Sequence, residues 1–318
     1  MHEVCWRTYW KGWMELYPAL WDTYRIGLKA ALNRLSVEGG LRRDWEAACT
    51  GTTGITNLDG WARDLVATGY LDGGARTRFA EIWVLTLRLP WELGADFFLR
   101  HLLDGDPAST TLTWRWMAGR TGAAPDGIAA AKGGTFPPDA AMRAALAVSG
   151  PRPAPLPPDW TPRLPSVLLL HEDDLSPDWL LEAGLRPAST AVLTATGGRS
   201  PLLPAPAVAA WSAAAARETL VRLSGRLGDP GPQVEGAGDV AGLVDWAAAS
   251  GAVQVVTAHA PVGPVADILA LLEPALAARG LPLVRPLRPW DARHWPLVVH
   301  GFGRFRAGAG LGWGSARQ

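Results

Sequence analysis

Residues 91–116 read WELGADFFLRHLLDGDPASTTLTWRW, and this stretch places two carboxylates, Asp104 and Asp106, on either side of a glycine. Three tryptophans bracket the pair: Trp91, Trp114 and Trp116. An ionised aspartate only accepts hydrogen bonds, so a carboxylate in a turn suits the ring N–H of a planar heterocycle. Tryptophans packed nearby would cover a buried redox ring. The alternative interpretation is structural, because Asp106 followed by Pro107 is also typical of a helix N-cap and its first residue.

The sequence around this stretch has the apolar periodicity of helices. Residues 2–17 carry large apolar side chains at spacings of three and four, which define one helical face: Trp6, Tyr9, Trp10, Trp13 and Met14. The same periodicity predicts helices over residues 21–35, 58–69, 75–89 and 97–103. Gly39 and Gly40 should end the first of these four, and Pro90 the third. Residues 1–120 are therefore predicted to form an all-helical domain.

The character of the chain changes after residue 120. Residues 121–165 are rich in Gly, Ala and Pro and are interpreted as a linker. Short β-like runs follow at residues 167–170, 190–195, 233–235, 253–257 and 283–284, with helical stretches at 207–227, 240–250 and 265–279. This alternation predicts an α/β domain over residues 166–318 with a Rossmann-like parallel sheet. A ligand crevice would lie at the carboxyl ends of the strands, near residues 171–174 and 257–259.

Composition narrows the class of protein. The two cysteines, Cys5 and Cys49, do not make a disulfide framework, and the six histidines have no metal-ligand spacing, so no metal site is expected. No signal peptide begins the chain and no uncharged run has membrane length, so we expect a cytoplasmic monomer without membrane contact. Lys and Arg together number 30, as do Asp and Glu, which gives no support for strong nucleic-acid affinity.

Several short motifs stand in a fixed order between residues 45 and 119. They are Thr53-Gly54, Asp59, Arg63, Thr68-Gly69-Tyr70, Arg76, Trp91-x-x-Gly94, Asp104-Gly105-Asp106 and Trp114-x-Trp116. A helix before them begins Glu3-Val-Cys-Trp6-Arg7-Thr-Tyr9. In this order and at this spacing the motifs resemble the flavin-binding helical domain of the DNA photolyase and cryptochrome family. The resemblance covers roughly the first third of the chain.

The resemblance implies FAD as cofactor and a role for each matching residue. Asp106 would accept from the flavin N3–H, and Arg76 and Asp104 would form an ion pair beside the ring. Arg7 belongs to the helix at the mouth of the site, and Thr110 stands where the family has a polar group facing flavin N5. Trp114 and Trp91 match the first two electron-relay tryptophans. Three further residues match those that face the lesion in repair enzymes: Glu3, Trp6 and Trp116.

The chain also departs from the family pattern. After the Thr-Gly-aromatic motif, Gly73 replaces an Asn that helps to hold the cofactor. The family's phosphate-cradling segment lies upstream of the Glu-x-x-Trp-Arg helix, which here begins at the second or third residue. We therefore expect a chain that is truncated at its N-terminus relative to the family, and the retention of FAD is left open.

The second domain and the function each have more than one interpretation. Residues 166–300 resemble the family's light-harvesting α/β domain in element order, which implies a permuted relative with a second, antenna chromophore; an unrelated Rossmann-like domain is the alternative. For function, the first hypothesis is blue-light-driven electron transfer from FAD to pyrimidine dimers in damaged DNA. The others are a non-catalytic flavin photoreceptor or redox module, and a degenerate remnant that no longer binds FAD.

Overall fold

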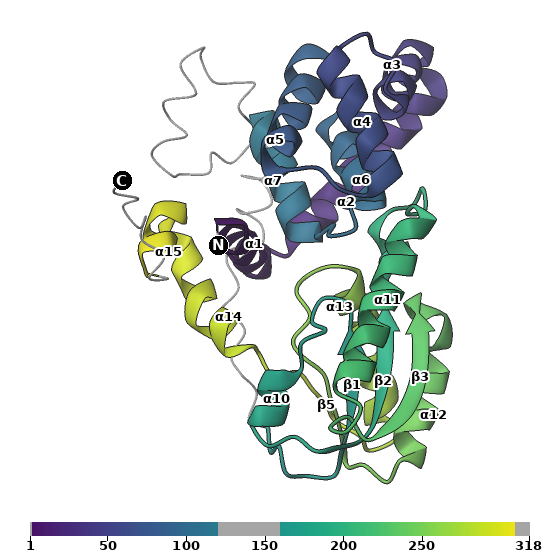
Figure 1. Cartoon of the computed structure of the whole chain (residues 1–318), viewed down its shortest axis with the longest axis vertical. Coiled ribbons are helices and arrows are strands. Elements are labelled where there is room, and N and C mark those ends of the chain that lie inside the picture. Colours follow the sequence, from purple (N-terminus) through teal and green to yellow (C-terminus); the bar gives the residue numbers. More distant parts are fainter. Residues whose placement is uncertain (1, 120–159, 309–318) are drawn as a thin grey trace. The chain divides into compact units, whose positions relative to one another are not determined.

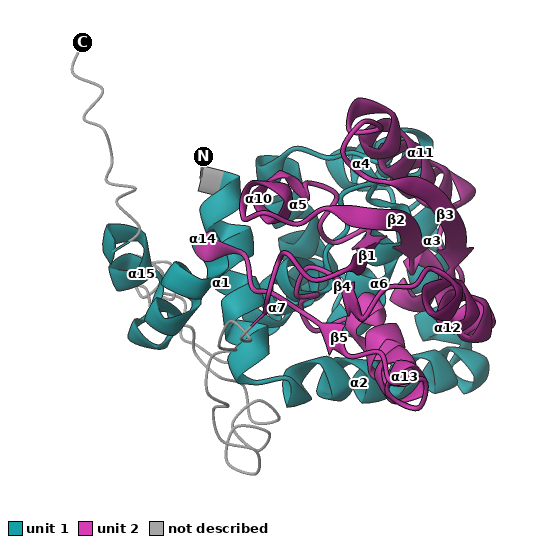
Figure 2. Cartoon of the chain, turned by 90° about the horizontal axis from the view of Figure 1, so that it is seen from below, with its two compact units in different colours: residues 1–154, 290–318 teal, residues 155–289 magenta. Residues whose placement is uncertain are grey.

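The computed structural model describes residues 2–119 and 160–308. Most of the predicted linker, residues 121–165, lies outside these ranges. The chain divides into two compact units, one of Met1–Ala154 with Trp290–Gln318 and one of Pro155–Pro289 (Figure 2). The first unit is helical and the second contains a parallel sheet, which confirms the predicted fold class.

The helical unit is built mainly from the N-terminal third of the chain (Figure 1). Its elements there are α1 (His2–Leu16), α2 (Ala19–Val37), α3 (Gly39–Thr50), α4 (Thr56–Thr68), α5 (Gly73–Glu81), the π-helical turn η1 (Ile82–Thr86), α6 (Trp91–His101) and α7 (Pro107–Gly119). Two expectations need correction. Gly39 begins a helix that the periodicity did not predict, and the helix expected over residues 75–89 changes at Ile82 into a wider π-helical turn.

Local hydrogen bonds fix where α4 and α5 begin. Asp59 of α4 accepts from the backbone N–H of Thr53 and of Gly54, each at 2.9 Å, and so orders the loop that enters this helix. Asp72 caps α5 by accepting from the N–H groups of Gly74 and Ala75. An N-cap acceptor satisfies N–H groups that have no partner within the helix. These hydrogen bonds fix the starts of α4 and of α5, the helix that carries Arg76.

Close packing of α6 on α7 depends on Gly94. A Cβ atom at this position would lie 2.2 Å from Cζ3 of Trp114. Only a residue without a side chain allows the Trp114 ring to lie directly against the α6 backbone. The ring is fully buried, as are Trp83, Phe79 and Phe97, and these aromatic side chains form the centre of the helical unit.

The end of the described chain belongs to the helical unit. From Pro289 onward the chain forms α14 (Pro289–His294), the 3₁₀ turn η6 (Trp295–His300) and α15 (Phe302–Gly308), and the helical unit resumes at Trp290. They pack on α1, where a Cβ at Gly12 would lie 2.8 Å from Trp295. The sequence-based boundaries assigned all of residues 166–318 to the α/β domain, whereas the compact units divide the chain again near residue 290.

The second unit contains a five-stranded parallel sheet in the order β3-β2-β1-β4-β5. Its strands are β1 (Ser166–His171), β2 (Pro187–Thr194), β3 (Asp229–Glu235), β4 (Gln254–Val256) and β5 (Leu283–Val284). On one face Leu168 and Leu170 pack with α10 (Asp178–Glu182) and α11 (Pro206–Arg222). On the other face Val167 and Leu169 pack with α12 (Val240–Ala249) and α13 (Pro264–Ala277). Burial of both faces explains why β1 is a continuous apolar run.

Candidate functional site

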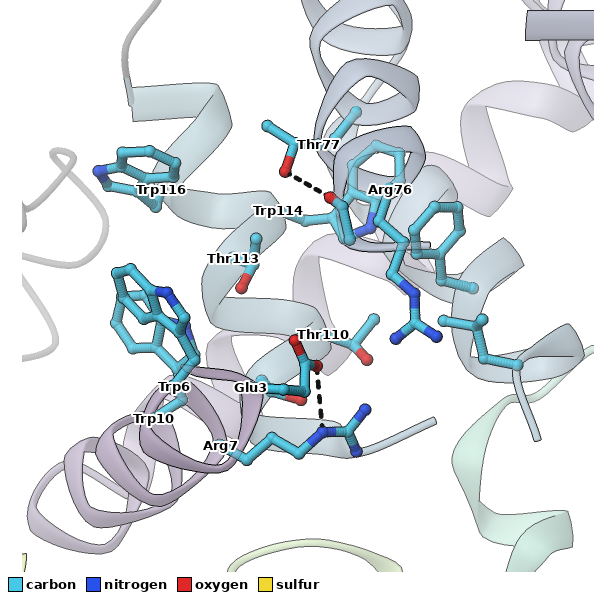
Figure 3. A pocket seen from close by; sticks show the side chains of 15 residues that line it. Glu3, Trp6, Arg7, Trp10, Arg76, Thr77, Thr110, Thr113, Trp114 and Trp116 are labelled. Atoms are coloured by element: carbon cyan, nitrogen blue, oxygen red, sulfur yellow. Dashed lines mark hydrogen bonds and ion pairs between the residues drawn. The ribbon is translucent and has the colours of Figure 1, made fainter. Parts of the chain in front are cut away.

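The helical unit contains a cavity of about 380 Å³ between α1, α5 and α7. Most of the residues selected from the sequence line it: Glu3, Trp6, Arg7, Arg76, Thr110, Trp114 and Trp116. Figure 3 shows the arginines and Thr110 on one side of the cavity and Trp6 and Trp116 on another. Trp91, Asp104 and Asp106 are not among the lining residues. The site thus combines aromatic walls with a polar side.

Asp104 holds two arginines beside the cavity. Its Oδ2 accepts from Nη2 of Arg7 at 2.6 Å, and its Oδ1 accepts from Nη2 of Arg76 at 3.0 Å. Arg7 also donates to the backbone carbonyl of Asp104 at 2.9 Å, and Arg76 to that of Leu71 at 2.8 Å. The ion pair expected between Arg76 and Asp104 is therefore present. Arg7 is an additional partner of Asp104 that the sequence did not pair with it.

The electrostatics keep Arg7 charged. Burial alone would lower the pKa of its guanidinium, but the carboxylates of Asp104, Asp106 and Glu3 outweigh that effect and raise the pKa. Arginine is already cationic at every pH a protein meets. Arg7 and Arg76 therefore supply cationic N–H donors at the polar side of the cavity, beside the Glu3 and Asp104 carboxylates with which they are paired.

Asp106 performs the structural role that the sequence left open. Its Oδ1 accepts from the Ser109 N–H at 2.7 Å at the start of α7, and its Oδ2 lies 3.1 Å from Nζ of Lys11. Burial opposes the charged form, yet Lys11, the Ser109 N–H and Arg7 together hold the pKa of Asp106 below its usual range. The carboxylate is therefore ionised. Its proposed contact with a flavin stays a prediction, because the side chain is turned to these partners.

The lowered pKa predicts a pH-dependent contribution to stability. A carboxyl group whose pKa is lowered by folding contributes fully to the free energy of unfolding above its unfolded-state pKa, near 3.9. The contribution is lost as the pH falls through the folded-state pKa. We expect Asp106→Asn to lower the free energy of unfolding by about 2 kcal/mol at pH 7, because the contact between Lys11 and the buried, ionised carboxylate of Asp106 is lost. Urea titrations from pH 7 to pH 3 should show this difference shrinking below pH 4. Asp64→Asn, at an exposed position on α4, is the control and should change little. A difference that stays constant down to pH 3 would contradict the ionised pair.

The tryptophans proposed as a relay have different surroundings. The Trp114 ring is in edge contact with Phe98, at 5.0 Å between centroids, and with Trp83, at 5.9 Å and 86°. Trp91 instead lies 5.9 Å from Tyr24, with the Arg115 guanidinium 5.8 Å from its ring centroid. Trp83 is thus a redox-capable neighbour of Trp114 that sequence reasoning missed. Its spacing of four from Phe79 was the available signal.

Trp6 is covered on one ring face by the C-terminal segment. Phe302 of α15 lies parallel to it, with 3.8 Å between ring centroids and 4° between planes. Tyr9 meets the same Phe302 ring nearly at right angles, at 5.3 Å. The residue expected to face a lesion is therefore stacked on another part of its own chain.

Comparison with known proteins agrees with this geometry. Residues 1–131 match the family model described as the FAD binding domain of DNA photolyase. The N-terminal part of this chain is a domain of the photolyase and cryptochrome family. Its photolyase-type domain includes every sequence-selected residue of the cavity described above.

Several curated proteins are similar to this photolyase-type domain. A chloroplastic/mitochondrial cryptochrome DASH of Ostreococcus tauri is 32% identical over 122 residues, covering 36% of this chain and 22% of the relative. A mitochondrial deoxyribodipyrimidine photo-lyase of Saccharomyces cerevisiae is 31% identical over 113 residues, 35% of this chain and 19% of the relative. A deoxyribodipyrimidine photo-lyase of Thermus thermophilus is 39% identical over 75 residues, which cover 24% of this chain and 18% of the relative. The chain spans about a fifth of the length of these relatives. No solved structure matches it significantly.

Outside the photolyase-type domain, a ligand crevice was predicted at the carboxyl ends of the strands, and the polar residues there have structural partners. His171 is fully buried and its Nε2 lies 2.8 Å from the Ala258 carbonyl, and Thr257 donates to the Leu169 carbonyl at 2.7 Å. Asp174 pairs with Arg288. These contacts tie β1 to the segments that follow β4 and β5. Among residues 2–119 and 160–308, no group of three or more His, Cys, Asp or Glu side chains is arranged to hold a metal, and no helix is long and apolar enough to cross a membrane.

Proposed function

We propose that the helical unit binds FAD in the cavity between α1, α5 and α7 and works as a light-driven electron-transfer flavoprotein. The observation that carries the proposal is the cavity itself. It combines two arginines that share the Asp104 carboxylate, the buried hydroxyl of Thr110 and aromatic walls inside a photolyase-type domain. Its volume of about 380 Å³ lies within the range of small-molecule sites, roughly 300–1,000 Å³. A planar ring with one polar edge suits this lining.

Each lining residue has a role that follows from its chemistry. Arg7 and Arg76, oriented by Asp104, would bind the electron-rich edge of the ring, and the Thr110 hydroxyl would donate or accept one hydrogen bond beside them. Bound FAD would supply a chromophore that accepts and returns single electrons. Trp114 forms the wall on the side of Trp83, and its apolar ring excludes water from the cavity. Trp91 stays a candidate for the electron relay and Asp106 for flavin binding, although neither residue lines the cavity.

Repair of pyrimidine dimers in DNA is the activity that we propose for this flavoprotein. It is supported by relatives that are named deoxyribodipyrimidine photo-lyase and by Glu3, Trp6 and Trp116, which lie at the same cavity. A flipped base needs an apolar wall to stack on and a polar group for its edge. The second candidate is a flavin photoreceptor that does not act on DNA, favoured by the balance of 30 cationic and 30 anionic residues.

Titration with FAD tests the cofactor proposal. The purified chain should develop a bound-flavin absorption band that survives gel filtration. Arg76→Ala should raise the dissociation constant for FAD at least about tenfold, because it removes a charge-assisted contact worth roughly 1.5–3 kcal/mol. Arg78→Ala is the matched control, since Arg78 lies on the same helix and is exposed. An intact fold without any flavin band would reject the proposal and leave a helical scaffold that no longer binds FAD.

A further inference from the structure

Trp83 contacts the Trp114 wall of the cavity but does not itself line the cavity. The two indole rings meet edge to face, at 86° and with 5.9 Å between centroids. The other rings in contact with Trp114 belong to Phe79 and Phe98, and a benzene ring is far harder to oxidise than an indole. Electron transfer becomes much slower as the distance between two rings grows. Within residues 2–119 and 160–308, Trp83 is therefore the redox-active ring best placed to give an electron to Trp114.

The local backbone holds Trp83 in this position. The residue belongs to the π-helical turn η1, and such turns are rare and occur frequently at functional sites. After the turn, Arg88 adopts a left-handed backbone with φ of 53°, which is uncommon for a residue other than glycine. The chain then returns to Trp83, whose carbonyl accepts from the Leu89 N–H at 3.1 Å and whose indole N–H donates to the Pro90 carbonyl at 3.0 Å. The ring and its N–H proton are thus both fixed.

Charge distinguishes Trp83 from Trp91, the relay residue that the family pattern suggests. The guanidinium cation of Arg115 lies 5.8 Å from the Trp91 ring centroid, and a positive charge there opposes removal of an electron from that ring. The cation–π contacts in the described parts of the chain do not involve Trp83. Burial opposes a charge on Trp83. Its oxidised indole would, however, make a charge-assisted hydrogen bond to the Pro90 carbonyl, roughly twice as strong as a neutral one.

We propose that Trp83, and not Trp91, is the electron donor of Trp114. The inference rests on the proposed function, in which FAD occupies the cavity. After light absorption, Trp114 gives one electron to the flavin and takes one from Trp83. The indole proton of Trp83 stays in its hydrogen bond to Pro90, because burial keeps solvent from the ring. Without an added reductant the electron returns from the flavin to Trp83, and no net oxidation results.

The position of Trp83 determines what it contributes. It lies one ring farther from the cavity than Trp114, so an electron returning from the flavin to Trp83 crosses a longer distance than one returning to Trp114. The separated charges therefore persist for longer. Trp83 acts through Trp114 and leaves the lining of the cavity unchanged, so its effect is on this lifetime and not on the affinity for FAD.

Flash absorption spectroscopy of the full chain loaded with FAD tests the proposal. The unchanged chain should form a long-lived tryptophan radical that keeps its proton, so its spectrum and its decay should not depend on pH. Trp83→Phe, which keeps an aromatic ring in the core, should lose this long-lived signal, and Trp91→Phe should retain it. Trp61→Phe is the matched control and should also retain it, because Trp61 lies on α4 and does not line the cavity. Loss of the signal in Trp91→Phe and its persistence in Trp83→Phe would overturn the proposal.

The flavin-free chain gives an independent measurement. In nuclear magnetic resonance spectra of the chain with isotope-labelled tryptophan, one indole N–H signal should be missing from Trp83→Phe. In the unchanged chain that signal should exchange slowly with heavy water, because the N–H is buried and bonded to Pro90. Fast exchange would show that solvent reaches the ring, and would overturn the retention of the proton.

FAD titration and circular dichroism of the same variants keep the outcomes distinct. Normal folding and flavin binding of Trp83→Phe with an unchanged radical signal overturns the role of Trp83 alone. A flavin-loaded, unchanged chain that forms no tryptophan radical overturns it as well. Absence of flavin binding in the unchanged chain overturns the cofactor proposal and, with it, this role. If Trp83→Phe does not fold, Trp83→Tyr takes its place: a phenol gives up its proton on oxidation, so a neutral tyrosyl signal should replace the tryptophan signal.

Discussion

Replacing Gly94 with alanine should destabilise the helical unit by about 2–3 kcal/mol, the usual cost of overpacking a filled core. The added Cβ would meet two atoms of the Trp114 ring, at 2.2 and 2.4 Å, so the buried indole or the α6 backbone would have to shift. This cost exceeds the roughly 0.5–1 kcal/mol that alanine gains over glycine inside a helix. Urea unfolding followed by far-UV circular dichroism measures the difference.

Two companion variants make the Gly94 prediction specific. Gly60→Ala on α4 is the control, because nothing lies within 4 Å of a Cβ at that position, and it should be neutral or stabilise by up to about 1 kcal/mol. Trp114→Phe removes the ring atoms that would clash. In the double variant the two changes should therefore cost less than their sum, with a coupling of about 1 kcal/mol or more. Strict additivity would mean that Trp114 does not lie on the α6 backbone.

Local sequence patterns were sufficient for the architecture. Spacings of three and four placed α1, α2 and α4, because burial of one helical stripe repeats along the sequence, and short β-like runs placed all five strands. They failed where a single residue separates two helices. Gly39 was interpreted as a helix end, yet it begins α3 with only Glu38 between it and the last residue of α2, a tight connection that has no periodic signal.

The candidate site was predictable where it depends on a motif and not where it depends on distant contacts. The pairing of Arg76 with Asp104 followed from the family pattern. Arg7 pairs with Asp104, and Lys11 pairs with Asp106. Both cations lie on α1, about a hundred residues before the carboxylates, and neither spacing nor composition reveals these pairs. Phe302 reaches Trp6 from the other end of the described chain. Such contacts arise only when the tertiary fold brings helices together.

Replacing Asp104 with alanine should have the largest effect on the site itself. Both arginines would lose their shared carboxylate, and only Arg7 would keep an ion pair, the one with Glu3 at 3.3 Å. We expect the dissociation constant for FAD to rise by more than about tenfold, because the polar wall is no longer held in one arrangement. Stability should fall by only about 1–2 kcal/mol, since the Asp104 side chain is 40% exposed and its ion pairs are partly screened by water.

The comparison of two Asp104 variants separates charge from shape. Asp104→Asn keeps a hydrogen-bond acceptor of similar size but no charge, so it should bind FAD with an affinity between those of the unchanged chain and Asp104→Ala. Asp64→Ala, an exposed change on α4, should leave both affinity and stability unchanged. Absorption titrations and urea unfolding of the same samples give the two quantities. If Asp104→Ala bound FAD as tightly as the unchanged chain while Arg76→Ala did not, Arg76 would act alone and the orienting role of Asp104 would be wrong. If neither change mattered, the flavin would have to bind away from this cavity.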